Sequence, residues 1–188
     1  MGTRILWQRI DRPGHELSSL EPHAGGWRLA GTVLLAHDTL PCQLNYDIQC
    51  NSNWETQTVS VNGHLGAKSA NVVFSRNPAG AWYSNDEHVP EVDGCTDIDL
   101  GFSPATNLLP IRRLALPIGG RAVVRAAWLP FPELSLKLLD QVYTRLDSDH
   151  YLYESADGSF QRNLHVGADG FVLEYPDYWR TVAIAKTE

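Results

Sequence analysis

The chain has 188 residues, of which 43% are hydrophobic, and it carries six Trp and seven Tyr. A chain of this length and composition can bury a core without disulfides or metal ions, so we expect one folded domain over residues 1–188. The formal net charge of −7 argues against a nucleic-acid partner and against an anionic membrane surface, because both attract basic proteins.

The N-terminal segment, residues 1–13, lacks the apolar core and small-residue cleavage site of a secretory signal. No run approaches the roughly 18 consecutive apolar residues that a membrane-spanning helix needs. Three cysteines, Cys42, Cys50 and Cys95, are an odd number at unrelated spacings, which is typical of free thiols in a reducing compartment. We therefore predict a cytoplasmic protein without a transmembrane segment.

Alternation of apolar and polar side chains with a period of two recurs in the first half of the chain, which indicates half-buried antiparallel strands. The strands predicted in this way span residues 27–35, 43–50, 54–61, 70–74 and 81–84. Asn62-Gly63 is a favoured hairpin dipeptide and is expected to end the third of them. Residues 77–80, Asn-Pro-Ala-Gly, form another expected turn.

The segment 94–113 concentrates polar groups in an otherwise apolar and proline-punctuated stretch. If residues 95–101 are extended, Asp97 and Asp99 share one face, with their side chains about 7 Å apart. Two such carboxylates are stable only if they are solvated or if cations approach them. Arg112 and Arg113 are the nearest cations along the chain.

A single helical turn is expected over Pro104 to Leu109, with Ser103 as its cap. The second half then repeats the strand pattern. Its predicted strands span residues 121–129, 151–154, 160–166, 171–175 and 179–185, with Asp-Gly turns at 157–158 and 169–170. Leu134 to Leu146 fits both a strand and a helix. In total we predict an all-β antiparallel barrel or sandwich of about ten or eleven strands.

The run from Gly94 to Leu100, followed by Ser103 to Leu114, resembles the signature of a bacterial family named putative glycolipid-binding. Other pieces of that pattern occur in the expected order along nearly the whole chain: Trp7, Gly14-His15-Glu16, Trp54, Trp82, Gln141-Val142-Tyr143, Tyr151-Leu152-Tyr153, Gly170-Phe171-Val172 and Tyr175-Pro176. Ser103 and Leu108 stand where the family pattern has Thr.

This resemblance implies an open β-barrel, or half-barrel, similar to lipoprotein-sorting carriers, and it favours a strand over residues 134–146. Those carriers hold acyl chains in an apolar concavity. The leading hypothesis is therefore non-catalytic binding of a lipid or glycolipid, with the tail in the concavity and the head group near the acidic and basic side chains. The candidate ligand-binding residues are Glu16, Asp97, Asp99, Asn107, Arg112, Arg113 and Trp128.

Each candidate also has a purely structural interpretation. Asp97 and Asp99 can form an internal network with the arginines that holds the 104–110 loop. Asn107 fits a loop-capping amide, and Trp128 fits ordinary strand packing. The sequence leaves open whether the interior of the barrel is filled by side chains or hollow.

Two further functions stay open. Glu16 with Asp97 or Asp99 can form the carboxylate pair of a small glycoside or ester hydrolase, although Gly14-His15-Glu16 also fits a solvated turn. Alternatively, exposed edge strands can pair between subunits of a dimeric scaffold. We expect no metal and no cofactor, because the seven His and three Cys form no recognised ligand motif.

Overall fold

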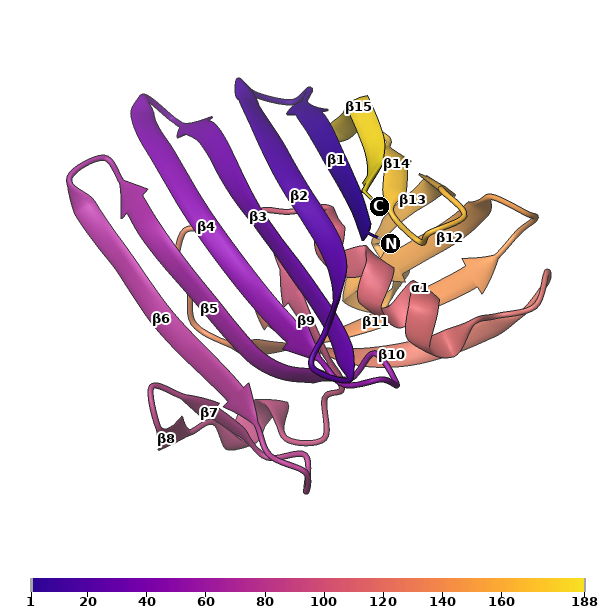
Figure 1. Cartoon of the computed structure of the whole chain (residues 1–188), viewed down its shortest axis with the longest axis horizontal. Helices are drawn as coiled ribbons and strands as arrows, with labels where there is room; N and C mark the ends of the chain where they lie inside the picture. The colour runs from indigo at the N-terminus through magenta and orange to yellow at the C-terminus, as the bar shows by residue number, and fades with distance from the viewer. Residues whose placement is uncertain (1, 188) are drawn as a thin grey trace.

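A computed structural model describes residues 2–187 and contains one sheet of 15 strands that is curved but not closed (Figure 1). The strands are β1 (Gly2–Arg9), β2 (Gly14–His23), β3 (Gly26–His37), β4 (Leu40–Cys50), β5 (Thr56–Leu65), β6 (Lys68–Arg76), β7 (Trp82–Ser84), β8 (Glu87–His88), β9 (Asp97–Leu100), β10 (Arg121–Leu129), β11 (Lys137–Arg145), β12 (His150–Ser155), β13 (Phe160–Val166), β14 (Val172–Tyr175) and β15 (Trp179–Thr187). One α-helix, α1 (Leu108–Leu114), and the short 3₁₀ segments η1 (Pro90–Val92), η2 (Ala105–Asn107) and η3 (Ala156–Gly158) complete the described elements.

The strand order is β8-β7-β6-β5-β4-β3-β2-β1-β15-β14-β13-β12-β11-β10-β9, so the two terminal strands β1 and β15 pair in the middle of the sheet. Within residues 2–187 every pairing is antiparallel except that of β9 with β10. The sheet curls until β9 meets β5, where the Thr56 N–H bonds to the carbonyl of Thr96 at 3.1 Å. Figure 1 shows the resulting two arms of the sheet, with α1 between them.

The all-β, open, barrel-like prediction is confirmed, but ten or eleven strands is wrong because the described residues contain fifteen. The predicted set contains no strand over β1, β2 or β8, and β2 shows why such a strand is hard to recognise. Its buried side chains include Glu16 and Ser18, whereas Leu17 between them is 52% exposed on the outer face. Over residues 16–18 the usual alternation of apolar inside and polar outside is therefore reversed, although Leu20 further along the inner face is buried as expected.

The expected turn at Asn62-Gly63 is also wrong. Strand β5 continues through both residues to Leu65, and Asn62 pairs with Asn71 on β6. Gly63 has φ of +149°, and a Cβ there would lie 2.0 Å from the carbonyl oxygen of Gln43. Glycine is needed at this position because strand β4 approaches closely, not because the chain turns.

Two other expectations hold. Residues 137–145 form strand β11, as the family resemblance implied. The helical turn after Ser103 exists and is extended by α1, and the Ser103 hydroxyl accepts a hydrogen bond from the Ala105 N–H at 3.1 Å. Among residues 2–187 no helix is long and apolar enough to cross a membrane.

Side chains fill the inside of the curved sheet beneath its N-terminal arm. The large side chains with almost no exposed surface in this core are Trp7, Phe74, Trp82, Phe102 and Phe171. The indole N–H of Trp7 bonds to the Val172 carbonyl at 2.7 Å, and that of Trp82 bonds to the Cys95 carbonyl at 2.9 Å. Both indole N–H groups are thus satisfied, and the centre of the arm is packed rather than hollow.

Candidate functional site

A cavity of about 410 Å³ opens between the loop that follows β9 and the strands of the C-terminal arm. Six aromatic side chains contribute to its wall: Trp128, Tyr153, Phe160, Tyr175, Tyr178 and Trp179. Its volume lies in the range of small-molecule sites, and apolar walls with a few polar groups are typical of them. We call it the aromatic cavity.

The aromatic wall is a packed cluster. The ring centroids of Tyr153 and Phe160 lie 6.0 Å apart, and those of Tyr175 and Tyr178 lie 5.6 Å apart at nearly right angles. Tyr153 and Tyr175 meet in the same edge-to-face manner at 6.3 Å. Such contacts restrain the rings, so the wall keeps its shape without a ligand.

Asp99 brings a carboxylate to this cavity from strand β9. Its Oδ2 accepts a hydrogen bond from the side-chain amide of Gln141, which is only 2% exposed. The pKa of Asp99 is raised to about 6, chiefly by burial and to a smaller extent by the negative charge of Asp97. The group is therefore mostly ionised at neutral pH although it is poorly solvated.

Asp97 is used differently, although it lies on the same strand. It is 1% exposed, and Arg113 from α1 grips it with Nε 3.1 Å from Oδ1 and Nη2 2.5 Å from Oδ2. Burial raises the pKa of Asp97, and the Arg113 guanidinium offsets part of that rise. Neither residue borders the aromatic cavity. The pair ties α1 to β9.

Glu16 lies in strand β2 with none of its surface exposed, so the interpretation as a solvated turn is wrong. Its Oε1 accepts hydrogen bonds from the hydroxyls of Tyr46 and Ser103, each at 2.6 Å. Its Oε2 is buried and has no hydrogen-bond partner within the described part of the chain. Burial raises the pKa of Glu16 to about 8, so this carboxyl group is mostly protonated at neutral pH.

A glycine makes this network possible. Tyr46 on β4 and Ser18 on β2 are separated by Gly31 on β3, which pairs with both. A Cβ at Gly31 would lie 2.5 Å from the Tyr46 hydroxyl, so only glycine lets the tyrosine reach across β3 to Ser18, at 2.8 Å, and to Glu16. Ser103 in turn borders the aromatic cavity, so Glu16 lies directly behind the cavity wall.

The other three candidates have separate environments. Asn107 borders the cavity, but its amide donates to the Pro104 carbonyl at 3.2 Å and its Oδ1 accepts from Tyr143 at 2.9 Å. Trp128 borders the cavity from β10. Arg112 points elsewhere: its guanidinium carbon lies 4.9 Å from the ring centroid of Trp54.

The structure thus brings Asp99, Asn107 and Trp128 together at the cavity, and it places Glu16, Asp97, Arg112 and Arg113 outside its lining. Apart from Trp128, the sequence analysis named none of the aromatic wall residues as a ligand contact, although Tyr153, Phe160 and Tyr175 lie on correctly predicted strands. Aromatic residues at alternate strand positions were the available signal. Strand alternation alone does not show which face borders a cavity.

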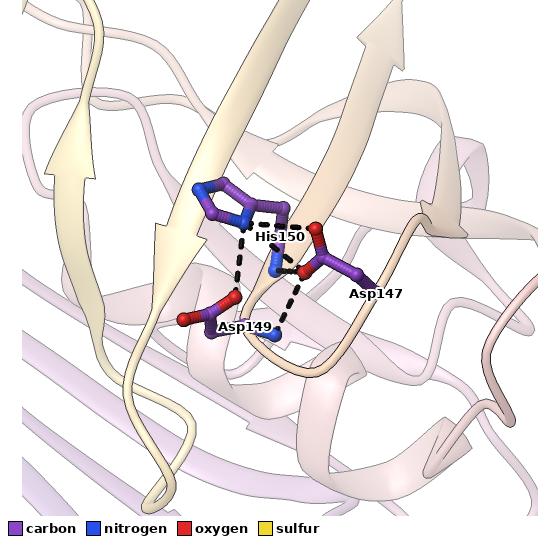
Figure 2. A group of neighbouring side chains, drawn as sticks. All are labelled: Asp147, Asp149 and His150. Atoms are coloured by element: carbon purple, nitrogen blue, oxygen red, sulfur yellow. Dashed lines mark hydrogen bonds and ion pairs between the residues drawn. The ribbon is translucent and has the colours of Figure 1, made fainter.

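Asp147 and Asp149, on the loop before β12, form a second polar cluster with His150, the first residue of that strand (Figure 2). The His150 Nδ1 lies 3.0 Å from a carboxylate oxygen of each aspartate, and its ring stacks on that of His165 at 5.2 Å. The three side chains lie close enough to share a metal ion, but exposed acidic groups commonly gather without one. Their mutual contacts account for the arrangement.

We expect His150 to titrate above the ordinary histidine value of 6.5, because hydrogen bonding to Asp147 and the charges of both aspartates stabilise the imidazolium form and raise its pKa. The ring-proton chemical shifts of His150, followed by NMR against pH, measure this directly. Asp147→Asn should lower the midpoint. An unchanged midpoint in that variant would show that the contact in Figure 2 does not persist in solution.

Comparison with known proteins identifies the family of the chain. Residues 4–181 match the model of the family described as "Putative glycolipid-binding". The chain belongs to that family. Among solved structures it is similar to a DUF1089 family protein from Pseudomonas aeruginosa, with 32% sequence identity and a TM-score of 0.79 over 88% of this chain and 91% of the other. A search of functionally curated proteins found no match.

Proposed function

We propose that the protein binds an amphipathic ligand of the lipid or glycolipid type in the aromatic cavity and does not convert it chemically. The observation that carries this proposal is the cavity itself, with a volume of about 410 Å³ and aromatic walls that meet a carboxylate. The family description supports the same class of ligand. Aromatic rings pack equally well on alkyl chains and on the apolar faces of sugar rings, while Asp99 can accept hydrogen bonds.

The filled core supports the aromatic cavity as the place where this ligand binds. Trp7, Trp82 and Phe102 occupy the inside of the sheet beneath the N-terminal arm, so an acyl chain cannot lie there without displacing them. The aromatic cavity is large enough for a head group or a short part of a chain. The rest of the ligand is therefore expected to extend beyond it.

The hydrolase alternative has less support from the geometry. Glu16 and Asp97 have 0% and 1% exposed surface, and the carboxylate of Asp97 is occupied by Arg113. A hydrolase of the carboxylate-pair type needs two carboxyl groups that reach the same substrate bond. Of the three acidic candidates Asp99 alone borders the cavity, so we retain binding without catalysis as the proposed function.

Two neighbouring leucines on β11 provide a matched test. Leu139 borders the aromatic cavity, whereas Leu138 faces the opposite side of the strand and is 38% exposed. Leu139→Trp should fill part of the cavity and weaken binding of octyl glucoside at least tenfold by calorimetric titration. Leu138→Trp adds the same bulk outside the cavity and should bind like the natural protein.

Native mass spectrometry of the purified protein gives an independent check, because a tightly held lipid would appear as added mass that Leu139→Trp loses. If octyl glucoside binds both tryptophan variants equally, the ligand does not occupy the aromatic cavity. If no amphiphile binds and none co-purifies, the proposed function is wrong.

A further inference from the structure

Asp99 is a half-buried carboxylate at the aromatic cavity, and none of the ion pairs found in residues 2–187 includes it. Arg113 does not supply a cation to Asp99, because its Nε and Nη2 atoms both donate hydrogen bonds to Asp97, two residues away on β9. The hydrogen bond from Gln141 satisfies one oxygen of Asp99 but brings no positive charge. A charge that is only partly solvated in this way is stabilised when a counter-charge reaches it.

Two arginines lie close to the aromatic wall, and neither compensates Asp99. Arg9 borders the cavity, with its guanidinium carbon 5.1 Å from the Trp179 ring centroid, but it is paired with Asp11 at 2.6 Å. Arg162 lies over Phe160 at 4.7 Å and pairs with Asp177 at 3.2 Å. Each guanidinium therefore has a carboxylate of its own, and the negative charge inside the cavity remains unbalanced.

The walls around Asp99 suit a cation as well. Aromatic faces attract cations through their ring quadrupole, and the attraction is strongest where water is excluded. Arg9 over Trp179 and Arg162 over Phe160 show that the rings of this cluster already accept positive groups on their faces. Trp128, Tyr153 and Tyr175 border the same cavity, and none of the cation contacts found in residues 2–187 uses them.

We propose that the ligand's polar end is a protonated or quaternary amine that lies against the Asp99 carboxylate, between the rings of Trp128, Tyr153 and Tyr175. This assignment rests on the proposed function, because it names the head group of the amphiphile that the aromatic cavity holds. A neutral sugar would satisfy hydrogen bonds at Asp99 but would leave the charge unbalanced. An anionic head group would add a second negative charge beside it.

Three amphiphiles with the same tail separate these cases: octyltrimethylammonium, octyl glucoside and octanoate. Calorimetric titration at neutral pH, below micelle-forming concentrations, should show that octyltrimethylammonium binds the natural protein at least tenfold tighter than octyl glucoside. Octanoate should bind most weakly. Asp99→Asn should remove the preference for the cation and leave the affinity for octyl glucoside within about twofold.

Asp140→Asn is the matched control, because it removes the same charge from the exposed face of β11, next to Leu139. It should keep the preference for the cation. If octyl glucoside binds the natural protein as tightly as the ammonium compound, the head-group assignment is wrong while the proposed function stands. If none of the three amphiphiles binds, both proposals fail. The comparison of head groups on the natural protein decides the assignment even where Asp99→Asn folds poorly.

Discussion

Replacing Asp97 with asparagine should destabilise the protein by about 3 kcal/mol or more, measured by urea unfolding at neutral pH. Asp97 is 1% exposed, and it is the carboxylate that receives both hydrogen bonds of the Arg113 fork. Removing its charge leaves a half-buried guanidinium without compensation. It also loosens α1 from β9, the strand that holds Asp99 at the cavity.

A double-mutant cycle isolates this pair from other effects of the substitution. Arg113→Met should also destabilise, because it leaves the Asp97 carboxylate buried alone. The double variant should be clearly more stable than the sum of the two single losses indicates, since neither charge is then unpaired. Asp86→Asn, in an exposed turn, serves as the control and should change stability little. Additive effects in the cycle would mean that the two groups do not interact in solution.

The arginine partners show where sequence reasoning reaches its limit. Arg112 and Arg113 are adjacent in sequence, and both were expected near the two aspartates. Successive residues of an α-helix point about 100° apart, so a short helix beside β9 can turn only one of them towards that strand. Arg113 has that position, and Arg112 packs on Trp54 instead. The choice between them depends on how α1 is rotated, which the pattern of residue types does not specify.

The C-terminal arm was the most predictable part of the fold. Strands β12, β13 and β14 are short, and the Asp-Gly pairs at 157–158 and 169–170 mark the turns between them. The aromatic cavity could not be predicted in the same way, because its residues come from β9, β10, β11 and the later strands, and they meet only when the sheet curls. Glu16 was recognised as a chemically important residue, but its burial depends on Gly31 and Tyr46 from two other strands.

Glu16→Gln should make the protein more stable than the natural form at alkaline pH, and the advantage should grow as the pH rises. The pKa of Glu16 is raised from 4.5 to about 8 in the folded protein by burial. Between those values the unfolded chain has lost this proton and the folded protein keeps it, so unfolding releases a proton and stability falls as pH rises. The slope is about 1.4 kcal/mol per pH unit and flattens above the folded-state pKa.

Glutamine has nearly the same shape as protonated glutamate and does not titrate. The unfolding free energy of Glu16→Gln should therefore not fall in this way as the pH rises. The difference in unfolding free energy between variant and natural protein should shift in favour of the variant by on the order of 4 kcal/mol from mildly acidic to mildly alkaline pH. Urea unfolding of both proteins at several pH values measures it. Comparing the two proteins cancels the contributions of other titrating groups, including Asp99, whose pKa is also raised.

Glu87→Gln, at an exposed position of β8, is the control and should track the natural protein at every pH. Parallel curves for Glu16→Gln and the natural protein would mean that Glu16 is already ionised at neutral pH. In that case the positive charge of Arg9, which favours the ionised form, would outweigh the effect of burial.

A protonated Glu16 has a structural consequence as well. Its Oε1 accepts a hydrogen bond from the Ser103 hydroxyl without placing a buried negative charge behind the cavity, so Asp99 remains the group that sets the charge of the site.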